Sequence, residues 1–106
     1  MNDIIKALFE LSKMIAIETV TLDRIICNGP CYLFGHSIAS DGGGEADALL
    51  YNGHSTNDPV FIHLDTLDEA AHQEMYFPPQ YFNKGLYIDI GTNVAGVTVR
   101  YIPVKS

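Results

Sequence analysis

Residues 86–104, with the sequence LYIDIGTNVAGVTVRYIPV, contain two apolar runs of the kind that form β-strands. β-Branched and aromatic side chains dominate both runs, 86–90 and 97–104, and this composition favours a half-buried pleated surface. The glycine, threonine and asparagine at residues 91–93 favour a turn between the two runs. We therefore expect two strands here, joined as a terminal hairpin.

Short strands separated by turn residues recur through the rest of the chain. Alternation of side chains predicts a strand over residues 15–22, and later apolar runs predict strands at 31–39, 46–51 and 60–67. Turn residues follow these runs, including a triple-glycine loop at 41–45 and the dipeptide Asn52-Gly53. Residues 68–77 fit either a helical turn or a strand, and Pro78-Pro79 is expected to end whichever forms.

About seven or eight short strands at this spacing predict an all-β fold, an antiparallel β-sandwich or jelly roll that occupies residues 15–106. Residues 1–14 have helical spacing instead and predict a short amphipathic helix or arm, which Asn2 or Asp3 can cap. Its apolar stripe consists of Ile4, Ile5, Leu8, Phe9, Leu11 and Ile15. Two interpretations remain open: the helix packs on its own domain, or it docks on a partner subunit. Charged residues interrupt the segment, so it fits neither a signal peptide nor a membrane span.

The composition excludes several classes of protein. The chain has 106 residues, of which 47% are hydrophobic and 18% charged, and this favours one folded core over a disordered chain. It has 13 acidic and 6 basic side chains, hence a formal charge of −7, which opposes binding to nucleic acid. Two cysteines do not form a disulfide scaffold, and no Asn-x-Ser/Thr sequence occurs, so nothing indicates secretion.

Catalytic motifs are weak. Residues 35–39 approximate the Gly-x-Ser-x-Gly nucleophile elbow, but no helix is predicted after Ser37 to complete that strand-turn-helix geometry. Among the four histidines, His63 shares a predicted strand face with Asp65, yet the compact His-x-His pattern of a cupin-like metal site is missing. We therefore expect no catalytic residue, no metal site and no cofactor, and the chain is not expected to be an enzyme.

Two further groups have open interpretations. Cys27 and Cys31 are separated by three residues, and we expect two buried thiols beside a bend, although a short turn could bring the sulfurs together in oxidising conditions. The aromatic segment around residues 76–82 fits either core packing or an apolar patch for subunit contact. The candidate contact residues are the six of the helical stripe together with Tyr76, Phe77, Tyr81 and Phe82.

Five short motifs, taken together, resemble a class of small β-sandwich virion proteins of tailed bacteriophages. The motifs are GPCYLFG at 29–35, LYNGHST at 50–56, FPP at 77–79, GLYIDI at 85–90 and VTVRY at 97–101. The resemblance is to head decoration or cement proteins and related fibre domains, and it covers roughly residues 17–104. The amphipathic segment at 3–14 and the acidic triple-glycine loop depart from that pattern.

The resemblance implies a capsid decoration protein that forms a homotrimer, binds the major capsid protein of a phage shell and stabilises the head. It would be made in the bacterial host cytoplasm and lie on the head surface of the virion. Neither nucleic acid nor a membrane is an expected partner. The alternatives are a tail or fibre module that recognises a host glycan and a small cupin-like metal-binding protein.

Overall fold

The structure is a computed structural model that describes residues 2–104, except for the side chains of Phe9, Leu11 and Ser12. Within these residues the chain forms the helix α1 (Asp3–Met14) and two four-stranded sheets. The strands are β1 (Ala16–Val20), β2 (Arg24–Cys27), β3 (Cys31–Ser40), β4 (Ala46–Asn52), β5 (Val60–Thr66), β6 (Ala71–Phe82), β7 (Leu86–Ile90) and β8 (Val94–Pro103). The predicted all-β sandwich with a short N-terminal helix is confirmed.

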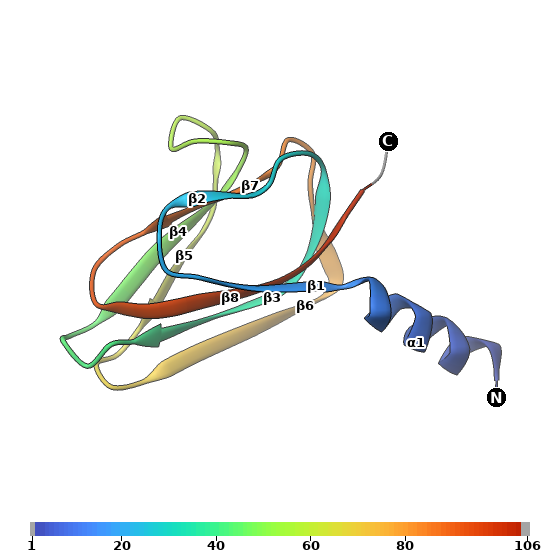
Figure 1. The fold of residues 1–106 in the computed structure, drawn as a ribbon, viewed down its shortest axis with the longest axis horizontal. Coiled ribbons are helices and arrows are strands. Elements are labelled where there is room, and N and C mark those ends of the chain that lie inside the picture. Colours follow the sequence, from blue (N-terminus) through green and yellow to red (C-terminus); the bar gives the residue numbers. More distant parts are fainter. Residues whose placement is uncertain (1, 105–106) are drawn as a thin grey trace.

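The strand order identifies the sandwich as a jelly roll. Sheet A has the order β1-β8-β3-β6, sheet B has the order β2-β7-β4-β5, and every neighbouring pair is antiparallel. Strand β1 pairs with β8, β2 with β7, β3 with β6 and β4 with β5. The chain therefore runs as a doubled antiparallel ribbon wound over both sheets (Figure 1), which is the jelly-roll arrangement.

The core lies between the two sheets and follows the period of two along each strand. On β3 and β8 the inward positions are buried and the alternate positions are more exposed. The largest fully buried apolar side chains come from both sheets: Phe82, Leu33, Ile38, Leu50, Leu86 and Ile88. Burial of such side chains is the main favourable contribution to folding.

The expected hairpin of residues 86–90 and 97–104 is wrong. Strand β7 belongs to sheet B and β8 to sheet A, so the turn between them carries the chain from one sheet to the other. Asp47 holds this crossing, since its carboxylate accepts the backbone N–H of Thr92 at 2.8 Å and its carbonyl accepts the N–H of Gly91 at 2.9 Å. The contact with Thr92 comes from a residue 45 positions away, so local turn propensity could not predict the crossing.

Strand β6 contradicts the expectation that Pro78-Pro79 ends the element. The ambiguous residues form a strand, not a helical turn, and this strand continues through both prolines to Phe82. The β3–β6 register jumps between the pairs Gly35–Met75 and Leu33–Gln80, so the prolines lie in a wide irregularity. Because β6 is an edge strand, no other strand pairs with its open side, and a missing N–H group on that side removes no hydrogen bond of the sheet.

The remaining strands agree with prediction apart from their ends and one omission. The expected strands at 31–39, 46–51 and 60–67 correspond to β3, β4 and β5, whereas the one at 15–22 is shorter and the one at 97–104 begins earlier, at Val94. Strand β2 was not predicted. It has only four residues, and its first two, Arg24 and Ile25, are exposed, so it lacks a clear apolar pattern.

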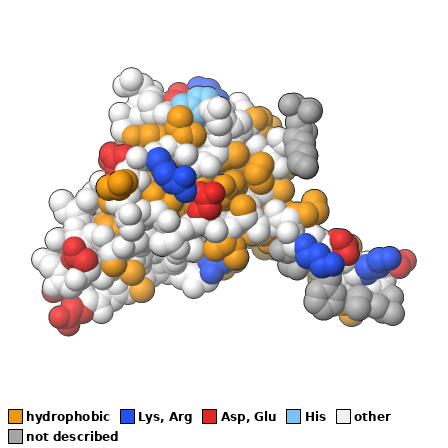
Figure 2. Space-filling view, viewed as in Figure 1, with side chains coloured by type: hydrophobic (Ala, Val, Ile, Leu, Met, Phe, Trp, Pro, Cys, Tyr) orange, Lys and Arg blue, Asp and Glu red, His pale blue; other side chains and the backbone are white. Residues whose placement is uncertain are grey.

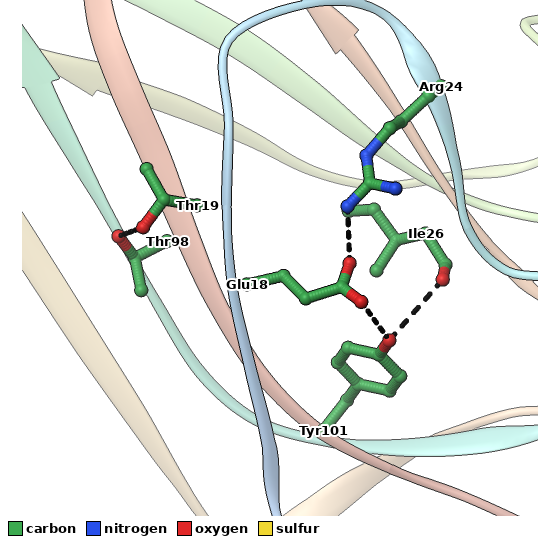
Figure 3. Close-up of polar contacts among 6 residues, drawn as sticks. All are labelled: Glu18, Thr19, Arg24, Ile26, Thr98 and Tyr101. Atoms are coloured by element: carbon green, nitrogen blue, oxygen red, sulfur yellow. Dashed lines mark hydrogen bonds and ion pairs between the residues drawn. The ribbon is translucent and has the colours of Figure 1, made fainter.

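A polar cluster joins the two sheets near the start of the chain. The Tyr101 hydroxyl on β8 donates to the Glu18 carboxylate on β1 at 3.0 Å, and it lies 3.4 Å from the Ile26 carbonyl on β2 (Figure 3). Arg24 of β2 forms an ion pair with the same carboxylate. Burial, followed by the contact with Glu18, raises the pKa of Tyr101 to about 12, so the hydroxyl stays protonated and able to donate.

Truncation of Leu50 tests the position of the core. Leu50 is fully buried, so Leu50→Ala is expected to lower the free energy of unfolding by about 2–5 kcal/mol, through lost burial and the cavity left behind. The control is Leu67→Ala, because Leu67 is 69% exposed, and its effect is expected to stay below about 0.5 kcal/mol. Urea unfolding of both variants measures the difference, and equal losses would contradict this core.

Candidate functional site

The outer face of sheet A has an apolar end and a polar end. The cross-strand register places outward residues in rows that run across the strands. Two rows lie at the end near α1: Ile102, Tyr32 and Tyr81, then Ile17, Arg100, Gly35 and Met75. The next row is polar: Thr19, Thr98, Ser37 and Gln73.

We use the name apolar end for the outward apolar residues of these strands near α1. They are Ile17, Tyr32, Met75, Phe77, Tyr81 and Ile102. Tyr32 and Tyr81 face each other with ring centroids 5.1 Å apart, and Phe77 is 92% exposed. A Cβ at Gly35 would collide with the Met75 sulfur, so glycine at this position lets the Met75 side chain lie across the sheet. Large apolar groups gathered on one surface indicate an interaction site.

Charge separates this face from the rest of the protein. The outward residues of the three rows include no carboxylate, and Arg100 is their only charged side chain. One terminal nitrogen of the Arg100 guanidinium is buried without a hydrogen-bond partner. Figure 2 shows hydrophobic side chains exposed on the sandwich and acidic side chains at its end far from α1. Figure 2 also shows acidic side chains in the middle of the sandwich and on the helix, so it is the three rows themselves that are free of carboxylates.

Sheet B presents acidic groups on its outer side. Asp47 and Asp65 are cross-strand partners on β4 and β5, and Asp89 lies on the neighbouring strand β7. Burial and the nearby Asp23 raise the pKa of Asp89, whereas the N–H of Thr92 lowers the pKa of Asp47. The outer side of sheet B thus carries carboxylates that the three rows of sheet A lack, together with an apolar row formed by Ile25, Tyr87, Tyr51 and Val60.

Helix α1 presents its apolar residues to solvent. The Asn2 side chain caps the helix by accepting the N–H groups of Ile4 at 2.7 Å and Ile5 at 3.2 Å, as predicted. Ile4 is 71% exposed and Leu8 is 55% exposed, and Figure 1 shows the helix projecting beyond the sandwich. Of the two interpretations of this segment, packing on its own domain does not fit these exposures.

The other candidate contact residues divide into two groups. Phe77 and Tyr81 lie on the apolar end, whereas Phe82 is 1% exposed and belongs to the core, so it is not a contact residue. Tyr76 also points inward, because it alternates with the outward Met75 and Phe77 and its ring contacts Phe61. Ile5 is exposed and Ile15 is partly buried, while the side chains of Phe9 and Leu11 lie outside the described residues.

A chain of side-chain hydrogen bonds lies on the inner side of β6 and leads from the exposed His72 to the buried His36. The Tyr76 hydroxyl donates to Glu74 at 3.3 Å and lies 2.8 Å from Nε2 of His36, so His36 donates through Nε2. Nδ1 of His36 is buried without a partner, and Glu74 also contacts His72 at 3.2 Å. Burial lowers the pKa of His36, the hydrogen bond from His72 lowers the pKa of Glu74, and burial raises the pKa of Tyr76 to about 12.

The sequence analysis did not predict this chain of hydrogen bonds. Alternation along residues 72, 74 and 76 would have placed all three side chains on one side of a strand. The ambiguity between helix and strand in this segment hid that pattern. The other two histidines lie elsewhere: His63 is 3.7 Å from Asp47, and His54 is 2.6 Å from the Asn28 carbonyl. Within residues 2–104 no three His, Cys, Asp or Glu side chains are placed to hold a metal ion.

The serine motif at 35–39 and the two cysteines are structural parts of the sandwich. Ser37 lies on the outer face within the continuous strand β3, not at a strand-to-helix turn, so the nucleophile-elbow geometry does not form. Cys27 and Cys31 are free and buried, as expected for the reduced pair. Burial, with a further contribution from Cys27, raises the pKa of Cys31 to about 12.

The buried imidazole makes stability depend on pH. Because the pKa of His36 is lower in the folded chain than in the unfolded one, the unfolded state binds the extra proton first. The free energy of unfolding should therefore fall as the pH drops below about 6.5, and His36→Gln should make that fall shallower. Urea unfolding at several pH values measures it. The exposed His63 provides the control His63→Gln, and an unchanged slope in His36→Gln would refute the assignment.

Thiol labelling tests the burial of the cysteines. A thiol with a pKa near 12 carries little reactive thiolate, so Cys31 in the folded protein at mildly alkaline pH should react with iodoacetamide at least about tenfold more slowly than in urea. Mass spectrometry of the alkylated peptide gives the rate. The exposed variant Leu67→Cys should react at the unfolded rate under both conditions, and rapid labelling of native Cys31 would contradict its burial.

Within the part of the chain that the structure describes, no helix has the length and apolar character needed to cross a membrane. No protein-family model, curated protein or solved structure matches the chain.

Proposed function

We propose that this chain is a structural protein of a phage virion, a decoration protein that oligomerises and reinforces the head shell. The observation that carries the proposal is the pair of uncovered apolar surfaces, the stripe of α1 and the apolar end of sheet A. Leu8 and Met75, one on each surface, are both more than half exposed. Apolar surface of this kind is stabilised when another subunit covers it.

Side-chain contacts that hold the sandwich together support the same structural role. A decoration protein transmits load between its neighbours, so its two sheets must not slide apart. The Tyr101 hydroxyl contacts Glu18 on the neighbouring strand β1 and Ile26 on β2 of the other sheet. Asp47 holds the crossing between β7 and β8 by hydrogen bonds. Both contacts join residues far apart in sequence, and neither uses the outer face of sheet A.

The charge distribution fits a protein of a particle surface. Acidic groups on sheet B and on the loops far from α1 keep particles dispersed and repel nucleic acid. The apolar end has no carboxylate to desolvate when a subunit covers it. The homotrimer implied by the motif resemblance would then present several identical contacts to the shell at once.

Co-sedimentation with empty phage heads tests the proposal. The purified protein should bind the heads saturably, at a fixed ratio to the major capsid protein, and should raise the temperature at which they break. Leu8→Asp is expected to weaken binding at least about tenfold, because losing oligomerisation removes multivalent attachment. Measured at a dilution where the unchanged protein is also a monomer, the Tm of Leu8→Asp should stay close to that of the unchanged protein, since Leu8 is 55% exposed in the single chain.

The control is Lys6→Gln, which changes an exposed polar position of the same helix and should preserve binding. Absence of binding to heads would contradict the proposed function. A glycan array run in parallel identifies the alternative, because saturable binding to a glycan without binding to heads would indicate a tail or fibre module. Equal loss of Tm and of binding in Leu8→Asp would indicate a helix that stabilises its own domain.

A further inference from the structure

Two apolar surfaces are exposed in the same chain, and its connectivity prevents them from covering each other. Helix α1 ends at Met14 and β1 begins at Ala16, so Ile15 is the only connecting residue, with φ −76° and ψ 120°. One extended residue cannot reverse the chain and lay the helix back over the sheet. Figure 1 accordingly shows α1 beyond the end of sheet A.

We propose that α1 of one copy docks on the apolar end of sheet A of a second copy, so that the protein self-associates by exchanging its N-terminal helices. This inference rests on the proposed function and deepens it, since it names the two surfaces that form the oligomer. The partner is a second copy because the chain supplies both halves of the contact and cannot join them within itself.

The dimensions of the two surfaces match. A helix of 12 residues is about 18 Å long, and four strands spaced about 4.8 Å apart span about 14 Å between their outer axes. One row of the apolar end extends from Ile17 on the edge strand β1 to Met75 on the edge strand β6. The helix can therefore cross the whole sheet and cover both edges of the apolar end.

Charge and solvation favour this face over the other. Arg100 is the charged side chain of the rows at this end, which hold no carboxylate. Helix α1 has two acidic and two basic residues and therefore no net charge, so no like charges oppose the contact. A helix on sheet B would have to remove the carboxylates of Asp47 and Asp65 from water, and the apolar end carries no such cost.

The area favours a closed assembly. A single helix about 18 Å long and about 10 Å wide is too small to bury the roughly 1,200 Å² of a stable interface. When every helix is exchanged in a closed assembly, each copy both gives and receives a helix, so the total buried area grows with the number of copies and no apolar stripe stays uncovered.

Two substitutions on one strand provide a matched test. Ile17→Asp and Thr19→Asp add the same charge to the same face of β1, but only Ile17 belongs to the apolar end. Light scattering over a dilution series should show an oligomer for the unchanged protein and for Thr19→Asp. For Ile17→Asp the dissociation constant should rise at least about tenfold.

A mixing experiment distinguishes a helix on a sheet from other contacts. Ile17→Asp retains an intact helix and Leu8→Asp retains an intact sheet face, so neither variant should associate alone. In a mixture, the helix of Ile17→Asp can dock on the sheet face of Leu8→Asp, so a complex with one such contact should form. Circular dichroism and urea unfolding confirm that each variant is folded. Met75→Asp, at the opposite edge of the same row, replaces Ile17→Asp if that variant does not fold.

Each contrary result overturns the inference in a recognisable way. If Ile17→Asp stays oligomeric while Leu8→Asp dissociates, the helices pack on one another. If Leu8→Asp stays oligomeric, the contact is between sheets. If Thr19→Asp dissociates as much as Ile17→Asp, added charge alone explains the loss. If the unchanged protein is a monomer, self-association is refuted, and binding of that monomer to phage heads would leave the proposed function standing.

Discussion

The burial of alternate side chains between two sheets is the constraint on which the rest of the structure depends. Once Leu33, Val97 and Val99 point inward, the residues between them must point outward. The outer faces are therefore free to carry any chemistry that keeps the alternation. One end of the outer face of sheet A is apolar and poor in charge, whereas the outer face of sheet B carries aspartates beside an apolar row. The surface that we propose to be functional is thus formed by the positions that alternate with the core.

Long-range contacts account for most of what local sequence patterns could not predict. The fold class and most strands follow from alternation and turn residues, because those signals are local. The crossing between β7 and β8 depends on Asp47, and the passage of β6 through two prolines depends on its place at a sheet edge, neither of which a local pattern contains. For the candidate site, the helical stripe was predictable from spacing. To predict that the Phe82 side chain points inward would have required the orientation of β6 in the sheet.

The chain of hydrogen bonds on the inner side of β6 shows how closely the interior and the surface are connected. Glu74 and Tyr76 point inward, and Met75 and Phe77, which alternate with them, point outward from the same strand. The hydrogen bonds of His36 therefore help to fix the strand that presents half of the apolar end. Each hydrogen bond of this kind adds little net stability, but the contact of His36 with Tyr76 favours one arrangement of the strand.

The irregular, proline-containing strand β6 also limits the addition of strands from other molecules to the sheet. An open sheet edge is a template for adding further strands, and a jelly roll that associates through its faces still has such edges. On β6 the two prolines lack N–H groups and distort the register, and at the other edge β1 is only five residues long. Neither edge of sheet A therefore offers a long, regular ladder to a further strand. The seven-residue strand β5 is an edge of sheet B, so resistance to strand addition is a property of the sheet that carries the apolar end.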